Sequence, residues 1–147
     1  MRFDPTTIIV LLDIRRRMQM TGTGTRKRIL VVDDEPQNIT IMREILKSDY
    51  TVIAATDGAR ALSLAQSASP PDLIMLDILM PGLDGYEILR RLKANARTAG
   101  LPVVLVTAKG EVDDKMTGYE LGSSDYITKP FESSFVLSVV RRLLSRS

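Results

Sequence analysis

The 147-residue sequence contains no cysteine, no histidine and no tryptophan. Without cysteine, the chain can form neither disulfide bonds nor thiolate metal sites. Without histidine, it lacks the commonest general base and the usual protein ligand of zinc and iron. Any chemistry must therefore use carboxylates, lysine and hydroxyl groups.

Long hydrophobic runs are also missing. The longest early apolar run covers residues 8–12, far short of the roughly 20 residues that span a membrane. A secretory signal has its positive charge before the apolar stretch, whereas here Arg15, Arg16 and Arg17 follow it. Because neither a spanning segment nor a secretory signal is present in the sequence, we expect a cytoplasmic protein that does not bind membranes.

A Gly-rich loop ending in Lys-Ser or Lys-Thr is also absent from the sequence, which disfavours a nucleotide-binding switch.

Charge is unevenly distributed along the chain. The sequence pI is about 9.0 and the net charge is +2. Residues 1–28 carry seven basic and two acidic residues, a net charge of +5, whereas the remainder carries 13 basic and 16 acidic residues, a net charge of −3. Residues 21–25 alternate Thr and Gly, as flexible linkers do. We predict a basic leader at residues 1–25 and one domain at residues 26–147. Because the domain is mildly acidic, we expect no direct binding of nucleic acid. DNA binding through the leader is an alternative.

Short apolar runs alternate with longer segments of helical periodicity, which is typical of a parallel sheet covered by helices. We predict strands at residues 28–32, 51–55, 72–76, 102–106 and 125–128. Apolar residues at helical spacing indicate helices within residues 39–46 and 59–65, and further helices are expected at residues 86–94, 112–121 and 132–144. The pattern predicts an α/β fold with five parallel strands.

Acidic, hydroxyl and amino side chains follow four of these strands: Asp33, Asp34 and Glu35 the first, Asp77 the third, Thr107 the fourth and Lys129 the fifth. The carboxyl ends of parallel strands face one edge of a sheet, and ligand sites form at that edge. These side chains therefore predict an oxygen-rich site for a metal ion and a phosphoryl group.

Most of these residues also have an ordinary structural explanation. Asp34 or Glu35 could simply cap the following helix. Thr107 could be a strand-end hydroxyl and Lys129 a loop lysine. Asp77 is harder to explain in this way, because an acid that follows a buried strand is partly desolvated and needs a partner or a proton.

The sequence resembles the receiver domains of two-component response regulators over about residues 28–146. The resemblance rests on four motifs in order: ILVVDDEP at residues 29–36, PDLIMLDILMPGLDG at residues 71–85, VTA at residues 106–108 and DYITKPF at residues 125–131. The family spacing of 30 residues from phosphoacceptor to threonine and 22 more to lysine is met by Asp77, Thr107 and Lys129. The resemblance implies a doubly wound, flavodoxin-like (βα)5 fold with strand order 2-1-3-4-5, and a cis peptide bond before Pro130.

The resemblance also implies the chemistry of the site. In this family, the counterpart of Asp77 accepts a phosphoryl group from phosphohistidine. Asp33, Asp34, Asp77 and the backbone carbonyl of Leu79 would hold one Mg²⁺, which prefers octahedral oxygen ligands. Lys129 would then pair with one phosphoryl oxygen.

The family further implies a switch. The hydroxyl of Thr107 would move toward a second phosphoryl oxygen, and Tyr126 would rotate into the space behind it. The surface formed by the fourth helix, fifth strand and fifth helix of the domain would then change shape.

The implied partners are a sensor histidine kinase or a histidine phosphotransfer protein, a downstream target or output domain, and a second copy of the chain bound through the switch surface. The resemblance favours a signalling domain that catalyses only its own phosphorylation and slow dephosphorylation, either stand-alone or part of a larger regulator. A phosphatase on a related fold is the alternative, although such enzymes place two acids two residues apart after strand one. Here, Asp33 and Asp34 are adjacent.

Overall fold

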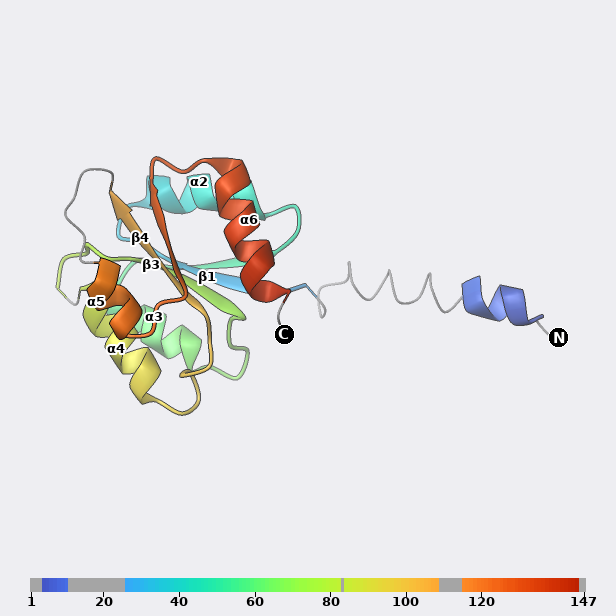
Figure 1. Ribbon diagram of the computed structural model, residues 1–147, viewed down its shortest axis with the longest axis horizontal. Helices are drawn as coiled ribbons and strands as arrows, with labels where there is room; N and C mark the ends of the chain where they lie inside the picture. The colour runs from blue at the N-terminus through green and yellow to red at the C-terminus, as the bar shows by residue number, and fades with distance from the viewer. Residues whose placement is uncertain (1–3, 11–25, 83, 109–114, 146–147) are drawn as a thin grey trace.

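Five apolar segments pair side by side as parallel strands of one sheet, in the order β2-β1-β3-β4-β5. The computed structural model describes residues 4–10, 26–82, 84–108 and 115–145. Its strands are β1 (Arg28–Val32), β2 (Thr51–Ala55), β3 (Leu73–Asp77), β4 (Val103–Ala108) and β5 (Asp125–Lys129). The helices between and after them are α2 (Pro36–Leu46), α3 (Gly58–Ala65), α4 (Gly85–Ala94), α5 (Lys115–Glu120) and α6 (Ser133–Leu144) (Figure 1). The predicted doubly wound fold and strand order are confirmed.

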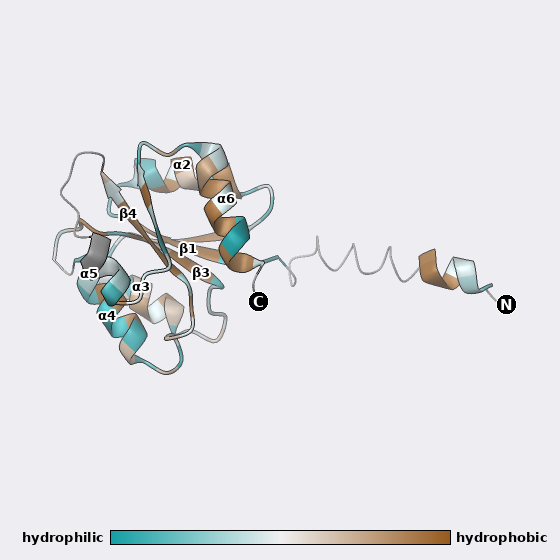
Figure 2. Cartoon of the chain, viewed as in Figure 1, coloured by the Kyte–Doolittle hydropathy of each residue, from teal (hydrophilic) through white to brown (hydrophobic). Residues whose placement is uncertain are grey.

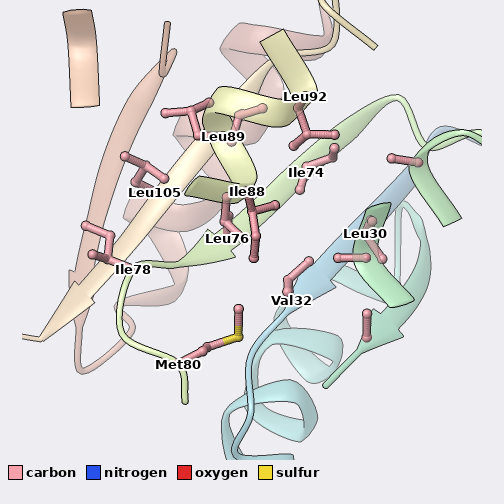
Figure 3. Packing of buried hydrophobic residues seen from close by; sticks show 14 of the residues in the cluster. Leu30, Val32, Ile74, Leu76, Ile78, Met80, Ile88, Leu89, Leu92 and Leu105 are labelled. Carbon is pink, nitrogen blue, oxygen red and sulfur yellow. The ribbon is translucent and has the colours of Figure 1, made fainter. Parts of the chain in front are cut away.

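Two hydrophobic cores form, one on each face of the sheet, because the central strands are buried on both sides. Leu30, Leu76 and Leu105 belong to the core that also contains apolar residues of α3 and α4 (Figure 3). Val31 and Val106 belong to the other core, which contains residues of α2 and α6. In Figure 2, the central strands are correspondingly the most hydrophobic part of the domain. Packing on both faces holds the strands in place, and it therefore also holds in place the edge of the sheet at which they end.

The strands β1 and β2 have the predicted bounds, whereas β3, β4 and β5 end later than the sequence predicted. Asp77 is the last residue of β3, and β4 continues through Thr107 to Ala108. The reason is that parallel pairing continues beyond the apolar runs: Asp77 pairs with Val106, and Ala108 pairs with Lys129. The side chains of Asp77, Thr107 and Lys129 therefore stand on regular strand backbone, which positions them more rigidly than a loop would.

The helices largely match the predicted segments. Pro36 occupies the first turn of α2, and α6 begins one residue after Glu132, whose carboxylate accepts a hydrogen bond from the Phe135 N–H as its N-cap. The predicted helix at residues 112–121 is shorter where it is described, because α5 ends at Glu120 before Gly122, whose φ is +102°. Residues 112–114 lie outside the described residues.

The predicted leader is described only in part. Residues 5–10 are helical, with Ile8, Ile9 and Val10 exposed, whereas residues 1–3 and 11–25 lie outside the described residues. Over the part of the chain that the structure describes, every helix is too short or too polar to cross a bilayer.

Candidate functional site

Three carboxylates meet where β1 and β3 end. Asp33 lies one residue beyond β1, and Asp77 closes β3. Because Val32 pairs with Leu76 across these neighbouring strands, the two acids emerge beside each other. Oxygens of Asp33, Asp34 and Asp77 all lie within 4.8 Å of one another. The structure thus brings together the three acids that the sequence singled out as metal ligands.

Backbone hydrogen bonds orient these acids. Asp33 is 3% exposed, and its Oδ1 accepts a hydrogen bond from the Glu35 N–H at 2.9 Å. Asp77 is 5% exposed, and its Oδ1 accepts one from the Leu79 N–H at 3.1 Å. Glu35 is the N-cap residue of α2, yet its side chain makes no capping hydrogen bond. Helix capping therefore does not explain the acid at Glu35.

Lys129 reaches this cluster from β5, two strands away from β3. Its Nζ lies 3.1 Å from Asp77 Oδ2 and 3.2 Å from Asp33 Oδ2. The peptide bond between Lys129 and Pro130 is cis, as the family resemblance implied. One ammonium faces three carboxylates, which leaves a net charge of −2 if all are ionised. A divalent cation would neutralise that charge, and a hard ion such as Mg²⁺ suits carboxylate oxygens.

Burial and charge shift the pKa of both partners. Burial raises the pKa of Asp77 to about 6; the hydrogen bond from Lys129 acts against this increase, and the charge of Asp33 adds to it. Burial alone would lower the pKa of Lys129, but the hydrogen bond to Asp77 and the charges of both acids outweigh it and raise that pKa above its usual value. Lys129 is therefore the permanent cation of the site, and Asp77 is an acid held ionised at a cost.

That cost predicts a pH-dependent stability in metal-free protein. A folded-state pKa near 6, above the usual 3.8, means that Asp77 favours folding most below about pH 4, and that this contribution is lost as pH rises through 6. We expect the free energy of unfolding to fall by up to about 3 kcal/mol across that range through Asp77 alone. Urea denaturation in EDTA from pH 4 to 7.5, compared with Asp77→Asn, isolates this contribution. Parallel pH curves for the two proteins would contradict it.

Gly85 lets the loop after Asp77 fold back against β3. Its N–H donates to the Ile78 carbonyl at 2.9 Å. A Cβ at this position would lie 2.5 Å from the Asp77 carbonyl oxygen and 2.6 Å from the Ile78 Cα. Both are backbone atoms that cannot turn aside, so only glycine fits between α4 and the end of β3.

Replacing Gly85 with alanine should therefore displace the backbone that carries Asp77 and Leu79. We expect the midpoint of urea denaturation to fall, with a loss of about 2 kcal/mol in the free energy of unfolding, and Mg²⁺ binding to weaken. Gly100→Ala is the matched control, because a Cβ there meets no atom within 4 Å. Equal stability and equal Mg²⁺ affinity in the two variants would show that the close approach is unimportant.

A cavity of about 270 Å³ lies beside the acids, lined by Glu35, Asn38, Asp77, Leu79, Ala108 and Lys129. It adjoins a second cavity of about 440 Å³, to whose lining Asn38, Ile41 and Phe131 contribute. The sequence reasoning missed Asn38, since a lone amide in the first turn of a helix belongs to no motif. The carboxylate of Asp77 is therefore accessible from this cavity.

Thr107 and Tyr126 lie deeper. Thr107 is 1% exposed, and its hydroxyl is 3.5 Å from the Ala108 carbonyl oxygen. Thr107 and Tyr126 are not among the described residues that line the 270 Å³ cavity. Tyr126 is 5% exposed and packs in the same core as Leu105. Both residues are thus buried away from the cavity that opens at Asp77.

Comparison with known proteins gives consistent matches. The family of response regulator receiver domains matches residues 29–141. The chain is 41% identical over 121 residues to the DNA-binding dual master transcriptional regulator RpaA of Synechocystis, covering 82% of this chain and 50% of that protein. It is 44% identical over 122 residues to the alkaline phosphatase synthesis transcriptional regulatory protein PhoP of Bacillus subtilis, with the same coverage of each. The chain thus spans about half the length of these two relatives.

A solved structure shows a similar fold with a metal ion bound. The receiver domain of the sensor histidine kinase PA1611 from Pseudomonas aeruginosa, with a magnesium ion coordinated in its active-site cleft, is 30% identical and superposes with a TM-score of 0.74. The match covers 82% of this chain and 98% of that domain.

Proposed function

The chain belongs to the response regulator receiver family of two-component signalling, and from this membership we propose that Asp77 is its phosphoacceptor. The observation that carries the proposal is the setting of Asp77: a buried acid with its pKa raised to about 6, in contact with Lys129 and open to a cavity. Receivers are signalling domains, and the proposed reaction is a single transfer to the chain itself.

In the proposed reaction, a carboxylate oxygen of Asp77 attacks the phosphorus of a phosphohistidine, and the phosphorus–nitrogen bond breaks. The imidazole leaves with the electron pair and takes a proton from solvent. Lys129, already 3.1 Å from Asp77, would donate to a phosphoryl oxygen once that carboxylate has become an acyl phosphate. The Thr107 hydroxyl would then turn toward another phosphoryl oxygen.

The residues present fit one Mg²⁺. Asp33, Asp34 and Asp77, with the backbone carbonyl of Leu79, would hold it. When bound, the ion offsets the repulsion between an anionic nucleophile and an anionic phosphoryl group. The clustered oxygens of the three acids support this assignment.

We further propose the boundaries and partners of the domain. The domain begins at Arg26, whose guanidinium donates to the Lys47 carbonyl at 2.9 Å, with residues 1–25 as a leader outside it. The donor is a sensor histidine kinase or a histidine phosphotransfer protein. The output surface is the α5-β5-α6 face, which serves a downstream protein, an attached output domain or a second copy of the chain.

Acetyl phosphate, a small phosphoryl donor, tests the proposal without a kinase. With Mg²⁺, the intact protein should gain the mass of one phosphoryl group, and EDTA should prevent the gain. A protein that gains no mass with Mg²⁺ present would contradict the proposal. Rapid, continuous hydrolysis of a phosphomonoester would instead favour the phosphatase alternative.

A further inference from the structure

The tip of Tyr126 occupies the space that a side chain at Gly118 would need. Gly118 lies in α5 and is buried. A Cβ built on it would be 1.8 Å from the Tyr126 Oη, 2.7 Å from its Cζ and 2.8 Å from Leu105 Cδ1. Real Cβ atoms do not approach other atoms so closely. The present position of the Tyr126 ring therefore requires glycine at position 118.

The space that the Tyr126 ring fills beside Gly118 and Leu105 is called here its seat, and Tyr119, the next residue of α5, borders it on the outer side. The Tyr119 ring meets the Tyr126 ring edge to face, with centroids 5.3 Å apart and planes at 68°. Tyr126 is 5% exposed, whereas Tyr119 is 48% exposed. Tyr119 thus touches the buried ring and also faces outward from α5. A displacement of the Tyr126 ring would therefore also move Tyr119 and change the exposed surface of α5.

The strand register connects this seat to the phosphoacceptor. Tyr126 pairs with Leu105 on β4, and Thr107 is two residues further along the same strand. Residues two apart in a strand point to the same face of the sheet. Thr107 and Tyr126 therefore lie on the face covered by α4 and α5, with Thr107 nearer the end that carries Asp77.

We propose that Gly118 is a positioning residue that admits Tyr126 to its buried seat and so couples the phosphoryl site to the α5 surface. The inference rests on the proposed function, in which the Thr107 hydroxyl turns toward the phosphoryl group, and on the family's switch, in which Tyr126 occupies the inward position that it has here. A methyl group at position 118 closes the seat, because the ring is the movable partner and the helix backbone is not. The ring is then forced outward, and the phosphorylated arrangement loses stability.

The test measures binding of beryllofluoride, a stable mimic of the phosphoryl group, in the presence of Mg²⁺, with fluorine NMR as the readout. Gly118→Ala should bind it about tenfold more weakly than the wild type, a typical size for coupling between two sites. In a Tyr126→Ala background, the same Gly118→Ala change should alter the affinity by less than about twofold, because the ring that the methyl group meets is gone. Gly100→Ala, with open space around its Cβ, should bind as the wild type does.

Each outcome has a defined meaning. An equal loss of affinity in both backgrounds, or no loss in the native background, overturns the role of Gly118. If Gly118→Ala does not fold, adding Tyr126→Ala should restore folding in urea denaturation, and failure to restore it also overturns the proposal. A wild-type protein that does not bind beryllofluoride would contradict the proposed function itself, and the coupling with it.

Discussion

Asp77→Asn should take up no phosphoryl group from acetyl phosphate under conditions that label the wild-type protein completely. Asparagine has almost the same shape as aspartate, but its amide lacks the nucleophilic oxygen that forms the acyl phosphate. Among the carboxylates of the site, Asp77 is the one that is both buried and part of the cavity wall described above. Intact mass spectrometry of the two proteins, incubated side by side with Mg²⁺, measures the difference directly.

Loss of uptake must be separated from loss of folding, and the pKa of Asp77 allows this. Because ionised Asp77 is held at a cost, Asp77→Asn should be more stable than the metal-free wild type above pH 7, by about 1 to 3 kcal/mol after allowing for the lost contact with Lys129. Asp57→Asn is the matched control, since Asp57 is an exposed helix cap whose carboxylate accepts from the Arg60 N–H. Full labelling of Asp77→Asn would assign the phosphate to another residue.

The sequence was sufficient to predict the sheet and the acids at its edge. Runs such as residues 29–32 and 73–76 are apolar throughout and alternate with helical segments, which is typical of a parallel sheet covered on both faces. Once the strands are parallel, Asp33, Asp77 and Lys129 must emerge at one edge, where the Lys129 ammonium lies within 3.2 Å of both acids. The local apolar pattern was thus enough to predict a site built from residues far apart in the sequence, because a parallel sheet brings the ends of its strands together.

Other features depend on helix packing, which local pattern does not encode. Asn38 lines both cavities because α2 places it opposite Ala108 and Lys129, which line them as well. A Cβ at Gly118 would meet the Tyr126 ring only because α5 lies against it. The ends of β3, β4 and β5 lie beyond the predicted ones because the polar residues Asp77, Thr107 and Lys129 interrupt the apolar pattern. Hydrogen bonding with the neighbouring strand extends each one further.

Lys129→Met should destabilise the metal-free protein by about 3 kcal/mol at pH 8. Methionine keeps most of the apolar stem but removes the ammonium that lies 3.1 Å from Asp77 and 3.2 Å from Asp33. Two carboxylates that are almost fully buried would then face each other without compensation, and the pKa of Asp77 should rise further above 6. Urea denaturation in EDTA at pH 8 measures the loss.

Two conditions should repair this variant if the loss is electrostatic. Mg²⁺ restores positive charge between the acids, and lowering the pH to 5 protonates Asp77, so the deficit should shrink to about 1 kcal/mol or less in either case. Lys93→Met is the matched control: Lys93 is also half-buried, but its ammonium donates to the backbone carbonyls of Ala99 and Leu101. Its deficit should therefore be the same at both pH values and with or without Mg²⁺. If Lys129→Met behaves as this control does, Lys129 fills space rather than balancing charge. If instead Mg²⁺ rescues Lys129→Met alone, the lysine and the metal ion share one task, which is to keep Asp77 ionised and ready to attack.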